Sequence, residues 1–232
     1  MTRKGKNYMN AKKIVDRGQL YSIDDALLLM KEASFAKFDE SVDLAICTGL
    51  DTRHADQQLR GAFSLPKGTG KEVRVAVFAS GEKELEARES GADIIGAEDL
   101  AKKIQEGFLD FDVVLATPEM MKVVGRLGRI LGPRKLMPNP KTGTVTNDLT
   151  TAIKDYKGGK VNFTADTGGV IHVTIGRKSF EVDSLKENFD AFIKHVLKNK
   201  PNGAKGIYIK KIFVSTTMGP SVKVDLKEAL AS

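Results

Sequence analysis

The surplus positive charge of this chain is confined to its two end segments. The middle of the chain, residues 68–159, carries 14 Lys and Arg residues and 14 Asp and Glu residues. The two ends, residues 1–67 and 160–232, carry 23 basic and 16 acidic residues, which is the whole formal net charge of +7. Because remote segments share one charge character, we expect them to fold together as one basic, discontinuous domain. We expect residues 68–159 to form a neutral inserted domain, and the basic domain to hold a polyanion.

The bulk composition favours a cytoplasmic protein with no membrane partner. The chain has 232 residues, of which 41% are hydrophobic, enough for one large core or two smaller ones. A single cysteine, Cys47, excludes an internal disulfide framework and indicates a reducing compartment. The basic N-terminus is not followed by an apolar stretch, so we expect no secretory signal. The apolar run Ala26–Met30, whose length no other run exceeds, is far shorter than the roughly 20 residues that span a bilayer.

The middle of the chain alternates short apolar runs with charged helical patterns. The expected strands are Val73–Phe78, Asp93–Ile95 and Asp112–Ala116. The expected helices are Lys83–Glu89, Asp99–Gln105, one that begins at Thr117-Pro118, and Asn147–Tyr156. This alternation predicts a Rossmann-like α/β domain with a parallel sheet.

The glycines of this domain do not form a nucleotide-binding motif. The stretch Lys67–Lys71 (KGTGK) precedes a strand instead of following one, and Glu72 stands where a phosphate loop needs Ser or Thr. Gly125, Gly128 and Gly132 in GRLGRILG have neither the required spacing nor a strand directly before them. We therefore interpret these glycines as positions where the chain turns or packs closely, and we expect no cofactor.

A proline-rich basic stretch follows these glycines. Residues Leu131–Val145 (LGPRKLMPNPKTGTV) contain three prolines, which disfavour a helix or a central strand and predict a stiff loop. Arg134, Lys135 and Lys141 lie between or beside them. Two interpretations stay open: a rigid surface connection, or a pre-shaped basic loop for RNA or a neighbouring protein.

The end segments predict one two-layer α+β domain. Ser22, followed three residues later by Asp25, is typical of a helix start. The remaining expected elements are a strand at Val42–Ile46, a hairpin of Val161–Thr164 and Val170–Ile175, an amphipathic helix at Leu185–Leu197, and strands at Ile207–Val214 and Ser221–Val224. Neither end segment has enough elements for a core of its own, so we expect one sheet with two helices on one face.

No catalytic or metal-binding constellation is evident in the sequence. His54, His172 and His195 are widely spaced and, with one cysteine, form no recognisable set of metal ligands. The carboxylates of Glu82–Glu89 are typical of a solvated helix face. Cys47, in the middle of a strand, is most simply a small apolar side chain. We therefore predict that the protein is not an enzyme.

One polar segment suits the recognition of an RNA backbone. Residues Ser215–Pro220 (STTMGP) follow a strand and offer hydroxyl groups for phosphates or 2′-hydroxyls, with a glycine that permits close approach. Together with GPRKLMPNPKTGTV, SFAKFDESVD, RGAFSLPKGTGK and AKGIYIKKI, this segment resembles the family of large-subunit ribosomal protein number one in its bacterial form. The resemblance covers essentially the whole chain. It implies a split RNA-binding domain and an inserted Rossmann-like domain.

The resemblance also implies a set of RNA-binding residues. They match Lys37, Phe38, Glu40, Ser41, Arg53, Asp166, Gly168, His172, Ser215, Thr217, Met218 and Gly219 here. A phenylalanine at position 38 is more often part of a core than a platform for a base, and that alternative stays open. This chain has Thr164-Ala165-Asp166-Thr167 where the family usually has Arg-Asn-Asp-Lys. The loss of two positive charges should lower the salt dependence of RNA binding, since each phosphate contact adds roughly 0.7–0.9 to the slope of log affinity against log salt concentration.

The function implied by the resemblance has three parts. The protein would bind ribosomal RNA of the mobile stalk in the large subunit, assist release of deacylated tRNA from the exit site, and repress translation of its own operon messenger RNA. It would be cytoplasmic and ribosome-bound, and a monomer when free. Two alternatives stay open: a nucleotide-dependent enzyme, and a general RNA chaperone without a ribosomal site.

Overall fold

The chain divides into two compact units. The computed structural model describes residues 5–201, 203–204 and 206–231. The first unit comprises residues 1–70 and 161–232, and the second comprises residues 71–160. The boundaries thus fall at 70/71 and 160/161, whereas the sequence analysis placed them at 67/68 and 159/160. The mixture of an antiparallel sheet, a parallel sheet and helices confirms the predicted α/β and α+β fold class.

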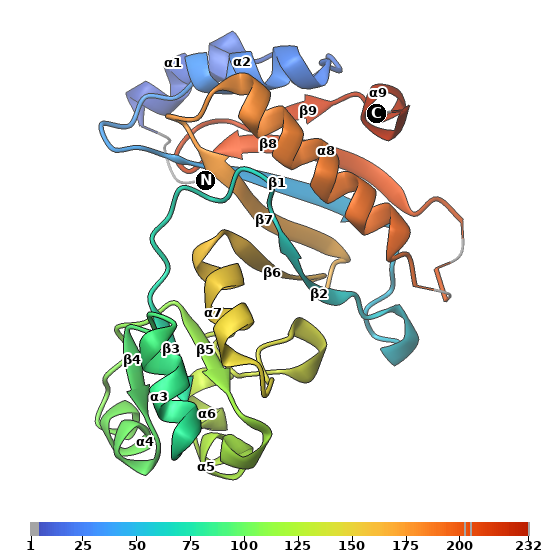
Figure 1. The fold of residues 1–232 in the computed structure, drawn as a ribbon. Coiled ribbons are helices and arrows are strands. Elements are labelled where there is room, and N and C mark those ends of the chain that lie inside the picture. Colours follow the sequence, from blue (N-terminus) through green and yellow to red (C-terminus); the bar gives the residue numbers. More distant parts are fainter. Residues whose placement is uncertain (1–4, 202, 205, 232) are drawn as a thin grey trace. The chain divides into compact units, whose positions relative to one another are not determined.

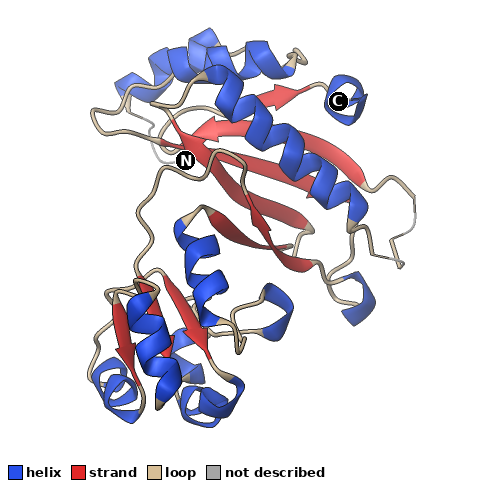
Figure 2. Cartoon of the chain, viewed as in Figure 1, coloured by secondary structure: helices blue, strands red, loops and turns tan. Residues whose placement is uncertain are grey.

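The first unit is a four-stranded antiparallel sheet with helices on one face (Figures 1 and 2). Its helices are α1 (Lys6–Ile14), α2 (Ile23–Glu32), α8 (Val182–Lys198) and α9 (Leu226–Ala231). Its strands are β1 (Ser41–Thr48), β2 (Arg60–Ser64), β6 (Lys160–Thr164), β7 (Val170–Arg177), β8 (Ile209–Thr216) and β9 (Val222–Val224). The strand order of the larger sheet is β7-β1-β8-β9, and β2 pairs separately with β6.

The alternation along β1 explains which face of the sheet is covered. Every second residue from Val42 to Thr48 is buried, and the residues between them are half-exposed. The buried side chains join those of α2 and α8 in one hydrophobic core. The first turn of α2 is capped as predicted, because the Asp25 N–H donates to Ser22 Oγ at 3.1 Å. The predicted arrangement of two helices over one face is therefore confirmed, and α1 adds a helix that the sequence analysis missed.

The predicted hairpin between residues 161 and 175 is wrong in its pairing. The turn at residues 166–169 forms, but β6 and β7 belong to different sheets and meet only at the bridge between Ala165 and Ile171. The reason is that β2 supplies a partner for β6. Phe63 of β2 and Phe163 of β6 both pack edge-on against Phe192 of α8, which fixes the small sheet to the core.

The second unit is the predicted parallel sheet. Its strands β3 (Val75–Phe78), β4 (Ile94–Gly96) and β5 (Val113–Ala116) lie in the order β4-β3-β5 and are parallel. Its helices are α3 (Glu82–Glu89), α4 (Glu98–Gln105), α5 (Met121–Arg126), α6 (Gly128–Leu131) and α7 (Leu149–Lys157). All residues of β3 are buried, because separate hydrophobic clusters cover the two faces of the sheet.

The expectation that the GRLGRILG glycines permit close packing is correct at one position and wrong at two. A Cβ atom at Gly132 would lie 2.6 Å from the carbonyl oxygen of Gly128, so Gly132 does permit close packing. At Gly125 and Gly128, a Cβ atom would meet no described atom within 4 Å beyond the neighbouring backbone. Neither residue has a positive φ. Within the described chain, neither packing nor backbone conformation therefore requires glycine at these two positions.

A buried amide fixes the segment through which the chain leaves the first unit. The fully buried Asn188 of α8 accepts a hydrogen bond from the Lys67 N–H at 2.9 Å. Its Nδ2 donates to the carbonyls of Gly68 at 3.0 Å and Ile175 at 2.8 Å. The side chain thus joins the departing segment to strand β7.

The Asn188→Leu variant should be less stable by about 2 kcal/mol, because the Lys67 N–H and two carbonyls lose their partner. Urea unfolding should show a lower midpoint with an unchanged slope. The control is Glu187→Gln, which removes only the exposed pair of Glu187 with Lys67 at 3.3 Å. This control should change stability by less than about 0.5 kcal/mol. Equal effects of the two substitutions would contradict the role of Asn188.

Candidate nucleic-acid interface

The segment after β8 and the residues before β1 form one structure. In the antiparallel pair, Val42 lies opposite Thr216 and Asp43 lies opposite Ser215. Beyond the ladder, the Thr217 N–H donates to the Ser41 carbonyl at 3.2 Å. The Ser41 N–H in turn donates to Thr217 Oγ1 at 3.1 Å. The Thr217 hydroxyl was expected to face RNA, but its oxygen already accepts a hydrogen bond from the backbone of Ser41.

The carboxylate of Glu40 lies at the centre of this structure and is fully buried. Its Oε1 accepts hydrogen bonds from the Ser34 hydroxyl at 2.8 Å and the Ala36 N–H at 3.0 Å. Its Oε2 accepts from the Met218 N–H at 2.9 Å. Burial by itself raises the pKa of this carboxyl, but these donors and the Thr216 side chain hold the pKa below its ordinary value. Both oxygens of the Glu40 carboxylate are turned inward, so Glu40 can serve an RNA site through the loop that it holds and not by direct contact of its side chain.

The Glu40 carboxylate presents the neighbouring residues to solvent. Met218 is anchored by its N–H, and half of its surface is exposed. The Gly219 N–H donates to Thr216 Oγ1 at 3.1 Å, and a Cβ atom at Gly219 would collide with the same oxygen. Glycine is therefore required at position 219 by the chain itself. The result is a tight loop with two backbone anchors and an exposed methionine.

Two predicted site residues lie in the exposed turn before Glu40. Lys37 is exposed, and Phe38 is 55% exposed. The alternative that Phe38 belongs to the core is therefore wrong. An exposed aromatic ring beside an ammonium group can stack on a base while the cation contacts a phosphate.

The other predicted residues gather at the opposite end of β1. The Thr48 N–H donates to the Gly169 carbonyl at 3.0 Å, and the Thr52 hydroxyl donates to the Asp166 carbonyl at 2.9 Å. The exposed loop that contains Arg53 therefore lies beside the turn that contains Asp166 and Gly168. Asp166 Oδ1 accepts from the N–H groups of Gly168 and Val170, so this carboxylate shapes the turn.

The half-exposed face of the sheet connects the two groups. Eight residues of β1 span about 24 Å at roughly 3.4 Å per residue. His172 lies along this face, opposite Ala45, and its Nε2 is 3.8 Å from Asp166 Oδ2. Five further residues of this face were not predicted as site residues. They are Asp43, Thr174, Lys211, Phe213 and Lys223, which the period-2 alternation and the strand register bring onto it.

Two kinds of feature are absent from the described residues. Among them, no group of three or more His, Cys, Asp or Glu side chains is placed to bind a metal ion. Within the same residues, no helix has the length and apolar character needed to cross a membrane.

The sequence comparisons show to which family the chain belongs. A family model described as the ribosomal protein L1p/L10e family matches residues 30–220. The chain belongs to this family. It is a ribosomal protein and not an enzyme. It is 55% identical over 226 residues to the large ribosomal subunit protein uL1 of Thermosipho melanesiensis, covering 97% of each chain. It is 53% identical over 231 residues to the large ribosomal subunit protein uL1 of Myxococcus xanthus, covering 98% of each chain.

The buried carboxylate predicts acid sensitivity of the loop. Because the pKa of Glu40 is lower in the folded protein than its ordinary value, ionised Glu40 stabilises the fold at neutral pH. This stabilisation is lost as the pH falls from about 4.3 through the folded-state pKa. Glu40→Gln should lower the free energy of unfolding by about 1–3 kcal/mol at pH 7, because one acceptor oxygen becomes a donor facing other donors.

The difference in stability between the wild-type protein and the Glu40→Gln variant should shrink below about pH 4. Urea unfolding at several pH values measures it. The exposed Glu32 of α2 provides a control, since Glu32→Gln should leave both the stability and its pH dependence nearly unchanged. A pH-independent difference for Glu40→Gln would show that the charge of this side chain is not what stabilises the loop.

Proposed function

We propose that this chain is a component of the large ribosomal subunit whose first unit binds ribosomal RNA of the mobile stalk. The names of its relatives support the assignment to the large subunit. The basic character of the end segments supports a polyanionic partner. The protein is then ribosome-bound in the cytoplasm. Its RNA-binding residues are those named by the sequence analysis, with Glu40 acting through the loop that it holds.

The observation that carries this proposal is the exposed loop of Thr217–Gly219 on its buried carboxylate. The loop conformation is held by hydrogen bonds from within the chain, so little conformational entropy is lost when RNA binds. Met218 offers apolar contact, and Gly219 permits close approach of a sugar-phosphate backbone. The chain has no tryptophan and 6% aromatic residues, which favours reading of folded RNA by shape and backbone over extensive base stacking.

Truncation of Met218 should weaken RNA binding without unfolding the protein. Because half of Met218 is exposed, Met218→Ala should leave the thermal midpoint nearly unchanged. The affinity for an isolated stalk RNA should fall about tenfold, which is about 1.4 kcal/mol. The control is Leu28→Ala on α2, where a similarly exposed apolar side chain is removed. If both variants bind the RNA equally well, the loop is not the RNA site.

The same site supports two further activities that we propose with it. A stalk protein beside the exit site can assist the release of deacylated tRNA. It can also repress translation of its own operon if the messenger RNA folds into an imitation of the ribosomal site. Repression of this kind requires the ribosomal RNA to bind more tightly, so that free ribosomal sites fill first.

The order of affinities tests the repression. Titration of the protein with stalk RNA, with the leader of its own messenger RNA and with an unrelated folded RNA should give the affinity order in which they are named. The unrelated RNA should also lose affinity most steeply with salt, because its binding lacks specific contacts. Equal affinities for all three RNAs would instead indicate a general RNA chaperone.

A further inference from the structure

The neutral charge of the second unit hides a strong internal separation of charge. Residues 120–147, here called the basic segment, contain six basic residues and no acidic residue. The other residues of this unit, 71–119 and 148–160, contain nine basic and 14 acidic residues. One part of the unit is therefore cationic and the rest is anionic, although the total is close to zero.

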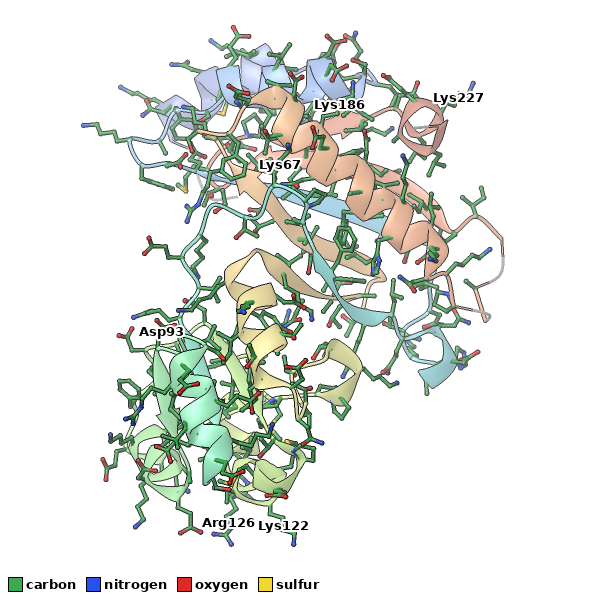
Figure 3. All side chains as sticks on the ribbon, viewed as in Figure 1. Lys67, Asp93, Lys122, Arg126, Lys186 and Lys227 are labelled. Atoms are coloured by element: carbon green, nitrogen blue, oxygen red, sulfur yellow. The ribbon has the colours of Figure 1, made fainter. Side chains whose placement is uncertain are left out.

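No ion pair among the described residues involves a cation of the basic segment. All six are exposed: Lys122, Arg126, Arg129, Arg134, Lys135 and Lys141. Among the described residues, every ion pair of this unit joins side chains outside the segment, such as Lys71 with Asp112 and Lys157 with Asp93. Lys122 and Arg126 are four residues apart on α5 and project together away from the body of the unit (Figure 3).

The backbone that carries these charges is firmly held. Asn139 and Thr144 are joined by hydrogen bonds in both directions, including Asn139 N–H to Thr144 Oγ1 at 2.7 Å. Tyr156 donates its hydroxyl proton to the Thr142 carbonyl at 3.2 Å. Val145 pairs with Ala116 at the edge of the parallel sheet. The backbone of residues 139–145 is therefore preorganised, and it loses little freedom when it meets a partner.

The two unexplained glycines lie within the same segment. Gly125 and Gly128 flank Arg126 and Leu127, and their Cβ positions face open space among the described residues. A glycine within a helix costs up to about 1 kcal/mol relative to alanine, so the exposed Gly125 of α5, whose Cβ position meets no described atom, is unfavourable for the fold. A partner's backbone could come close to the chain at these two positions, because glycine has no side chain to obstruct it.

We propose that the basic segment is a second RNA-binding surface, separate from the loop of Thr217–Gly219. Its arginine and lysine side chains contact phosphates, and Gly125 and Gly128 let the sugar-phosphate backbone come close to α5 and α6. RNA fits better than a protein partner, because no large apolar side chain of the segment is exposed within the described chain, and protein interfaces have an apolar core. The inference rests on the proposed function only in that the partner is RNA.

The first test removes charge in two places. One variant carries Arg126→Gln, Arg129→Gln and Arg134→Gln. The matched control carries Lys102→Gln, Lys103→Gln and Lys154→Gln, which removes three exposed charges from the anionic part of the same unit. Two titrations over a range of salt are made with the full-length protein. In the first, labelled stalk RNA is added to the protein, and in the second, labelled deacylated tRNA is added to protein already saturated with stalk RNA.

In one of the two titrations, the slope of log affinity against log salt concentration should be smaller by about 2 for the arginine variant. Each lost phosphate contact reduces this slope by roughly 0.7–0.9. A change in the first titration identifies the second surface as part of the stalk-RNA site, and a change confined to the second titration identifies a separate RNA. The inference is overturned if the arginine variant matches the wild-type protein in both, as it would for an acidic protein partner. The inference is equally overturned if the salt slope of the lysine control falls by the same amount. The Met218→Ala result is independent of all these outcomes, so failure here leaves the proposed function standing.

The second test uses Gly125→Ala. Because alanine favours the helix and its Cβ has room, the thermal midpoint should stay the same or rise. Binding in the titration that responds to the arginine variant should nevertheless weaken. A lower midpoint would show that Gly125 serves the fold, and unchanged RNA affinity would show that no backbone approaches it. Either result would overturn the close approach at α5.

Discussion

The buried Glu40 carboxylate is the contact on which the candidate RNA site depends. It accepts hydrogen bonds from Ala36 in the turn before β1 and from Met218 in the loop after β8, and Met218 is 178 residues from Glu40 in the sequence. A carboxylate without these donors would be costly to bury, and the donors without the carboxylate would be left unpaired. Each side therefore stabilises the other. The site is a property of the closed discontinuous domain and does not exist in either end segment alone.

The sequence alone predicts those parts of the fold in which local patterns and tertiary structure agree. The alternation of Val42, Leu44 and Ile46 predicts both the strand and its buried face, and the Ser22 cap predicts the start of α2. Strand β2 escapes prediction, because Arg60–Ser64 is short and half-exposed and has no apolar alternation. Because β2 is not predicted, the sequence pattern pairs β6 with β7, which is the wrong neighbour. Such errors reflect choices between strands that only long-range contacts decide.

The candidate site, like the fold, can be predicted from the sequence only in part. Family resemblance predicts the residues, and the structure shows that their environments differ. Thr217 and Glu40 hold the backbone, whereas Met218, Lys37 and Phe38 present surface. No sequence pattern predicts the burial of Glu40, since its donors come from remote segments. The charge of the basic segment, in contrast, can be counted in the sequence. Only the structure shows that these charges form no ion pair with other described residues.

The discontinuous sheet also has a consequence for synthesis of the chain. Strand β1 is made early, but its partners β7 and β8 begin at Val170 and Ile209. The second unit, continuous from 71 to 160, can fold while these partners are still missing. Until then β1 has two unpaired edges, and such non-local pairing forms slowly. The newly made N-terminal segment therefore waits for β7 and β8, and the first unit and the candidate RNA site can form only after both strands are made.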